Sequence, residues 1–177
     1  VCIILPGESP HTFEITPERV KQLQGAKLAF KVGLGLDDWL DDTISSLGLG
    51  IQVHHLHQGI DLIEDKGAAN PHIWLSLVNA QTIVENISER LTGSFPQFKD
   101  EFEQNQQIYM ENLQEMDAEF KDEAANFSQS QFIAFHDAWS YMARDLGLEQ
   151  VMSVEPFPGK EPAPQYIIEL YETIQQY

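Results

Sequence analysis

The sequence of 177 residues contains a single cysteine, Cys2, which lies next to the first residue. One thiol cannot close an internal disulfide and cannot build a thiolate metal cluster, so both kinds of cross-link are excluded. The sequence also has no run of eighteen apolar residues and therefore predicts no membrane-spanning helix.

Positive charge is scarce as well. Lys and Arg together number 10 against 28 Asp and Glu, which gives a formal net charge of −18 at pH 7. This charge opposes binding to nucleic-acid backbones and to anionic membrane surfaces, so we expect neither as a partner. It is compatible with a cationic ligand. Apolar residues still make up 42% of the chain, which is enough for a hydrophobic core.

The longest regular pattern extends from Pro96 to Phe127, and neither Gly nor Pro interrupts it after Pro96. Its apolar residues recur in steps of three, four and seven, which is the stripe of one amphipathic helix. They are Phe102, Tyr109, Leu113, Met116, Phe120 and Phe127. Roughly thirty residues at 1.5 Å each span about 45 Å, which suits either a link between two lobes or a member of a helical bundle.

Strands and helices alternate on both sides of this helix. Apolar runs predict strands at 1–5, 28–32, 51–55, 131–135 and 150–154. Helix starts are predicted at Thr16 with Pro17, at Ser76 and at Asp137, since these residue types favour N-caps and the first helical turn. Residues 59–75 lack periodicity and predict a long loop.

This alternation favours α/β lobes with parallel sheets over a helical bundle. We therefore predict an N-terminal lobe at 1–95, a rigid linking helix at 96–127 and a partial C-terminal lobe at 128–177. The last segment holds only two strands and two helices, which is marginal for an independent core. We expect that the second lobe is incomplete.

Three histidines occupy related positions in the predicted topology. His11 lies in the loop after the first strand, His72 in the long loop before a helix, and His136 directly after the strand 131–135. Ligands of open α/β sheets bind outside the carboxyl ends of the strands, and neutral imidazole is a common zinc ligand. A structural role for each histidine and a shared metal site remain open alternatives.

The segments PHTFEITP, NPHIWLS and FHDAW resemble the solute-binding proteins of bacterial ABC importers for zinc and manganese, most closely the zinc-specific members. The resemblance covers nearly the whole chain, with the long helix between the second and third segments. It implies a two-lobed receptor that holds one metal ion in a cleft and delivers it to an ABC permease. The family's first three histidine ligands fall on His11, His72 and His136.

The resemblance also implies the metal and the setting. Manganese and iron receptors typically have Glu at the position of His136, so the histidine implies zinc, which imidazole suits better. We expect a monomer without enzymatic activity, periplasmic or otherwise extracytoplasmic, with a lipid anchor as one option. The fourth ligand is unassigned, because Pro10 stands where some zinc members have Glu. The family begins before VCIIL and continues past Tyr177, so we expect a chain truncated at both ends.

Other functions follow from the same residues. A manganese or iron receptor of the same family is the nearest alternative. A three-histidine zinc hydrolase is another, although the sequence has no HExxH motif. A structural or adhesive fragment without a metal is a third.

Several further residues have two interpretations each. His54, His55 and His57 form either a second zinc site or, as we prefer, a solvated strand edge. Glu155 either approaches the metal or, in the preferred interpretation, orders the proline-rich loop that follows it. Trp74 and Trp139 are expected to be core residues that seat the histidine loops.

Overall fold

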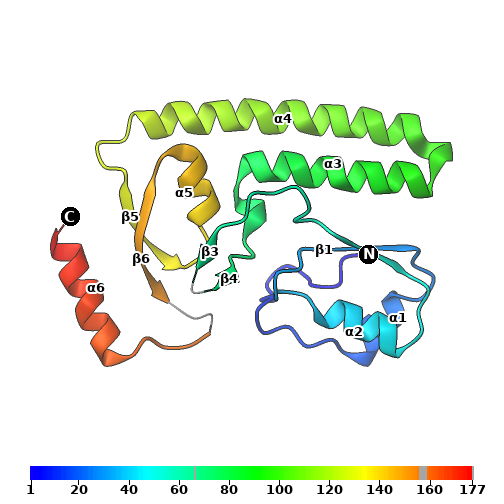
Figure 1. Cartoon of the computed structure of the whole chain (residues 1–177), viewed down its shortest axis with the longest axis horizontal. Helices are drawn as coiled ribbons and strands as arrows, with labels where there is room; N and C mark the ends of the chain where they lie inside the picture. The colour runs from blue at the N-terminus through cyan, green and yellow to red at the C-terminus, as the bar shows by residue number, and fades with distance from the viewer. Residues whose placement is uncertain (66, 156–158, 177) are drawn as a thin grey trace. The chain divides into compact units, whose positions relative to one another are not determined.

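The structure is a computed structural model that describes residues 1–65, 67–155 and 159–176. Helices and short parallel strands alternate along the chain, as the α/β prediction requires (Figure 1). The chain divides into two compact units, Val1–Gln58 and Gly59–Tyr177. The division into lobes 1–95 and 128–177 with a linking helix at 96–127 remains a prediction. No helix within the described ranges is long and apolar enough to cross a membrane.

The first unit contains two helices and two parallel strands. Strand pairing aligns Leu28 with Gln52 and Lys31 with His55. The core forms around Leu23, Leu40 and Ile44. The elements are α1 (Pro17–Gln22), β1 (Leu28–Lys31), α2 (Trp39–Ser46) and β2 (Gln52–His55). Helix α1 and strands β1 and β2 confirm the sequence predictions, and the hydroxyl of Thr16 accepts the expected capping bond from the Arg19 N–H (3.4 Å).

The strand predicted at 1–5 is not present. Within the described residues β1 pairs with β2 only, and the backbone of 1–5 joins no sheet. Ile3 instead packs its side chain against the core, and its carbonyl accepts a hydrogen bond from the Arg19 guanidinium (2.8 Å). The apolar run therefore indicated burial of side chains, whereas a strand also needs a partner for its backbone.

The second unit contains the remaining elements. They are β3 (Glu64–Asp65), β4 (Ala68–Ala69), the 3₁₀ turn η1 (Ile73–Leu75), α3 (Leu77–Ser94), the 3₁₀ turn η2 (Pro96–Phe98), α4 (Lys99–Ala125), β5 (Gln131–His136), α5 (Ser140–Leu146), β6 (Glu149–Glu155) and α6 (Pro164–Gln176). The region predicted as a long loop thus contains a two-residue antiparallel ladder, β3 with β4, and η1. Its residue Lys66 lies outside the described residues.

The predicted long helix is confirmed as α4, which is 27 residues long. It runs antiparallel to α3 and packs beside it (Figure 1). Of its predicted stripe only Leu113 is buried, while Tyr109 and Phe127 are more than half exposed. The stripe is therefore covered along only part of its length in the described structure.

The parallel strands β5 and β6 carry His136 and Glu155 at their carboxyl ends. Its register aligns His136, the last residue of β5, with Glu155, the last residue of β6. Helix α5 connects the two strands and ends at Gly147, whose left-handed φ of 67° favours glycine. Asp137 does not cap α5 as predicted. Its carboxylate accepts a hydrogen bond from the Gln150 side chain (2.7 Å), and α5 begins three residues later.

Candidate metal centre

His72 is buried at the start of η1 and is held by Asn70. The backbone N–H of His72 donates to the Oδ1 of Asn70 (2.9 Å), and its ring Nδ1 lies 2.8 Å from the same oxygen. Because that oxygen is an acceptor, Nδ1 carries the ring proton. The Nε2 of His72 therefore carries a lone pair, which is the form of the nitrogen that binds a metal.

His136 presents its Nε2 to the same place from the end of β5. Its Nδ1 lies 3.5 Å from Oε2 of Glu155, and both side chains are about one quarter exposed. The register of β5 and β6 brings this carboxylate to the ring. A carboxylate on Nδ1 favours the Nδ1–H tautomer, so the Nε2 of His136 is also the nitrogen available to a ligand.

The two Nε2 atoms lie 3.2 Å apart, with the rings at 84° to each other. Two imidazole lone pairs that face each other at this distance repel unless a cation or a proton lies between them. A tetrahedral zinc ion with Zn–N bonds of about 2.0–2.1 Å separates two ligand nitrogens by about 3.3–3.4 Å. The observed separation therefore fits two ligands of one zinc ion.

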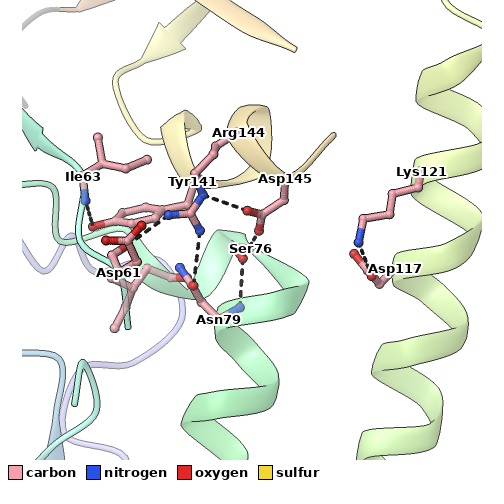
Figure 2. A network of polar contacts seen from close by, with 10 residues as sticks. Asp61, Ile63, Ser76, Asn79, Asp117, Lys121, Tyr141, Arg144 and Asp145 are labelled. Atoms are coloured by element: carbon pink, nitrogen blue, oxygen red, sulfur yellow. Dashed lines mark hydrogen bonds and ion pairs between the residues drawn. The ribbon is translucent and has the colours of Figure 1, made fainter. Parts of the chain in front are cut away.

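Tyr141 fixes the loop that carries Asn70 and His72. Its side chain is completely buried, and its hydroxyl donates to the Asn70 carbonyl (2.8 Å) and accepts from the Ile63 N–H (3.2 Å). Figure 2 shows the phenol of α5 directed at the backbone of Ile63. Burial raises the pKa of Tyr141, so the hydroxyl keeps its proton at neutral pH and remains a donor.

A second set of polar contacts joins α5 to the start of α3 (Figure 2). Ser76 caps α3, since its hydroxyl accepts from the Asn79 N–H (2.9 Å), and it donates to the Asp145 carboxylate. The Arg144 guanidinium binds Asp145 (2.9 Å) and the Asp61 carbonyl (3.0 Å). The segments that carry His72 and His136 are therefore tied together through α5, which favours a preorganised pair of ligands.

His11 lies in the first unit, in a turn closed by a hydrogen bond from the Thr12 N–H to the Ser9 carbonyl (3.3 Å). The second unit brings His72 and His136 together. The role of His11 as the third ligand remains a prediction from the sequence.

The sequence profile of the ZnuA family, described as zinc-uptake complex component A, periplasmic, matches residues 1–177. The chain belongs to this family. This confirms the resemblance on which the zinc prediction rested.

Two curated relatives show what share of a full-length family member this chain covers. It is 27% identical over 196 residues to the zinc-binding protein AdcA of Streptococcus pyogenes serotype M3, covering 97% of this chain and 38% of that protein. It is 30% identical over 180 residues to the high-affinity zinc uptake system protein ZnuA of Bacillus subtilis strain 168, covering 92% of this chain and 56% of the relative. The chain therefore spans about two fifths to just over half the length of these relatives.

Solved structures confirm the fold. A crystal structure of ZnuA matches with a TM-score of 0.89 at 29% identity, over 98% of this chain and 68% of that one. The Zn(II)-bound ZnuA-like domain of Streptococcus pneumoniae AdcA matches with a TM-score of 0.83 at 28% identity, over 98% and 65% of the two chains. The predicted α/β architecture with one long helix is thus that of the family.

The tryptophans beside the histidines are not core residues as predicted. Trp74 is 40% exposed and Trp139 is 37% exposed. Trp74 lies in η1 and Trp139 directly precedes α5. Both line an apolar cavity of about 220 Å³ together with Leu75, Leu77, Asp117, Phe120, Met142, Asp145 and Leu146. The Trp74 ring lies 5.4 Å from the His72 ring and can report on metal binding there.

The histidines at the end of β2 pack against the turn after β1. The Nδ1 of His57 donates to the Val32 carbonyl (2.6 Å), and the rings of His55 and His57 meet edge to face at 5.3 Å. Gly33 lies against both rings so closely that a Cβ there would stand 2.9 Å from His57. Strand β2 pairs only with β1 among the described residues, and all three histidines are half-buried, so this edge is solvated only in part, and its hydrogen bond to Val32 gives His57 a structural role.

Asn70 and Tyr141 are the site residues that sequence reasoning missed. Asn70 had a local signal, because an Asn before Pro often bonds the backbone two residues later, here that of His72. Tyr141 had none, since its partners Asn70 and Ile63 are more than seventy residues away.

Proposed function

We propose that this chain forms the zinc-binding part of an extracytoplasmic receptor, which captures one zinc ion and delivers it to an ABC permease. The observation that carries the proposal is the His72–His136 pair, whose Nε2 atoms converge at 3.2 Å while their Nδ1 atoms face acceptors. The names of the relatives, zinc-binding protein and zinc uptake system protein, support the same function.

His11 is the proposed third ligand, and water or a carboxylate completes the tetrahedron. Three imidazoles favour zinc over manganese, which prefers sites with more carboxylate oxygen. The net charge of −18 suits the attraction of a cation and disfavours nucleic acids as partners. The receptor acts as a monomer and catalyses no reaction, and its only partners are the ion and the permease.

The test is competition for zinc between the protein and a chromophoric chelator, repeated with manganese. We expect one zinc per chain and much weaker binding of manganese. His72→Ala and His136→Ala should each weaken zinc binding by at least about a hundredfold, because even changes that only perturb a ligand's orientation cost about 10–100-fold.

His55→Ala is the matched control, because this histidine in β2 is half-buried and is not one of the proposed ligands. It should leave zinc affinity within about twofold, with circular dichroism confirming that each variant is folded. Zinc binding that survives His72→Ala and His136→Ala unchanged would refute the proposal. Tighter binding of manganese than of zinc would favour the manganese receptor, and ester hydrolysis at stoichiometric zinc would favour the hydrolase.

A further inference from the structure

Glu155 contacts two groups at the end of β6. Its Oε2 faces the Nδ1 of His136 at 3.5 Å, and its Oε1 accepts a hydrogen bond from the Gly159 N–H at 2.8 Å. The second contact agrees with the expectation that Glu155 orders the loop after β6, of which residues 156–158 lie outside the described structure. The first contact places the same carboxylate behind a proposed zinc ligand.

We propose that Glu155 is the positioning residue of His136 and that it couples zinc occupancy to the chain segment at Gly159. This inference rests on the proposed function. Glu155 is not a ligand, because its carboxylate faces the nitrogen of His136 that points away from His72. It acts through the ring by fixing the tautomer and the orientation of His136.

The two histidines are held by chemically different acceptors. His72 has a neutral amide oxygen at 2.8 Å, a normal hydrogen-bond length. His136 has an anionic carboxylate at 3.5 Å, which is longer than a hydrogen bond but within the reach of an electrostatic contact. The contact between His72 and Asn70 is therefore already at hydrogen-bond length, whereas the contact between His136 and Glu155 can still shorten to it.

Zinc binding should shorten the contact between His136 and Glu155. A metal on Nε2 withdraws electron density from the ring, so the Nδ1–H becomes a stronger donor to the carboxylate. Because the other oxygen of Glu155 holds the Gly159 N–H, movement of the carboxylate toward His136 changes the hydrogen bond at Gly159. The amide of Gly159 thereby reports the state of the metal site.

The experiment compares the wild-type protein with Glu155→Gln and Glu155→Ala. Glu149→Gln is the matched control, since Glu149 lies at the opposite end of the same strand. We expect Glu155→Ala to weaken zinc binding by about 10–100-fold and Glu155→Gln to weaken it less, because an amide oxygen still accepts a hydrogen bond. The control should bind zinc within about twofold of the wild type.

Nitrogen-15 NMR of the imidazoles gives a readout that a merely structural role would not change. In the metal-free wild type, His136 should be the Nδ1–H tautomer, and Glu155→Ala should shift it toward the Nε2–H tautomer while His72 stays unchanged. Zinc should shift the Gly159 amide resonance in the wild type and leave it nearly unshifted in Glu155→Ala.

The outcomes separate the two proposals. If the wild type binds zinc but Glu155→Ala binds it within twofold, with His136 unchanged, the role of Glu155 is refuted and the receptor stands. If the wild type binds no zinc, the receptor proposal fails. An Nε2–H tautomer of His136 in the metal-free wild type would overturn the role of Glu155 in either case.

Discussion

Removing the hydroxyl of Tyr141 tests whether α5 holds the loop that carries His72. Tyr141→Phe keeps the fully buried ring and deletes one oxygen, which bonds both the Asn70 carbonyl and the Ile63 N–H. Neither backbone group gains another partner from the phenylalanine. The variant therefore isolates the hydrogen bonds from the packing of the ring.

The expected loss of stability follows from the Asn70 carbonyl and the Ile63 N–H, which lose their hydrogen-bond partner in the variant. A buried donor or acceptor without a partner costs about 1–3 kcal/mol. Asn70 and Ile63 are both half-buried, so water can offset part of the loss. We expect a decrease in the free energy of unfolding of about 2–3 kcal/mol, which corresponds to about 4–12 °C in Tm for a chain of this size.

Thermal and urea unfolding of three Tyr→Phe variants measures this cost against internal controls. Tyr171 is 63% exposed, so its variant should stay within about 0.5 kcal/mol of the wild type. Tyr166 donates one hydrogen bond to the Ser153 carbonyl (2.6 Å), and its variant should lose about 1 kcal/mol. If Tyr141→Phe loses no more than Tyr171→Phe, the network does not stabilise this loop.

The same substitution makes a prediction about pH. Because burial raises the pKa of Tyr141 in the folded state, the unfolded chain ionises first as the pH rises. The contribution of Tyr141 is therefore present below its usual pKa of about 10 and is lost at higher pH. Tyr141→Phe should remove that part of the alkaline destabilisation, as urea titrations from pH 8 to about pH 11 can measure. Equal alkaline slopes in both proteins would contradict it.

Two further predictions concern stability, each checked by urea unfolding. Burial lowers the pKa of Lys31, but its bonds to Asp41 and Asp38 outweigh this effect and raise the pKa. Lys31→Met should lower the free energy of unfolding by about 1 kcal/mol or less, because the carboxylates of Asp38 and Asp41 that lose their partner are exposed to water. The double variant Asp38→Asn with Asp41→Asn leaves the buried ammonium of Lys31 without a counter-charge and should lower it by about 3 kcal/mol. Gly147→Ala should destabilise by about 1 kcal/mol because its φ is 67°, while Gly93→Ala, in α3 with open space around it, should stabilise by about 0.5 kcal/mol. Equal losses of stability in Lys31→Met and in the double aspartate variant would contradict the first argument. Changes of the same sign in Gly147→Ala and Gly93→Ala would contradict the second.

Elements with strong local signals were predictable from the sequence. The caps at Thr16 and Ser76 and the 27-residue helix α4 follow from residue type and periodicity, which act over a few residues. The predictions at 1–5 and at Asp137 failed because partners distant along the chain decided them. Ile3 meets Arg19 in place of a neighbouring strand, and Asp137 bonds Gln150 in place of its own helix.

The candidate metal site also combines features with a local sequence signal and features that depend on residues distant along the chain. His72 and His136 could be singled out from the sequence because each lies beside a local motif at a strand or helix end, and their role as ligands stays a prediction. Their mutual distance was not, since it depends on Tyr141 and on the register of β6 against β5. The position of Glu155 opposite His136 follows from a register that a bulge at Phe132 and Ile133 shifts by one residue, and such a bulge has no reliable signal in the sequence.

The positions of the proposed ligands along the chain predict an order among the histidine variants. His72 and His136 belong to Gly59–Tyr177 and already hold their Nε2 atoms 3.2 Å apart, whereas His11 belongs to Val1–Gln58. His11→Ala leaves the preorganised pair of imidazoles in the second unit intact, while His72→Ala leaves only the imidazole of His136 in that unit. Zinc affinity should therefore fall less for His11→Ala than for His72→Ala, and the quenching of Trp74 by zinc should persist in the former. A larger loss for His11→Ala would mean that the pair in the second unit is not the part of the site that captures the ion.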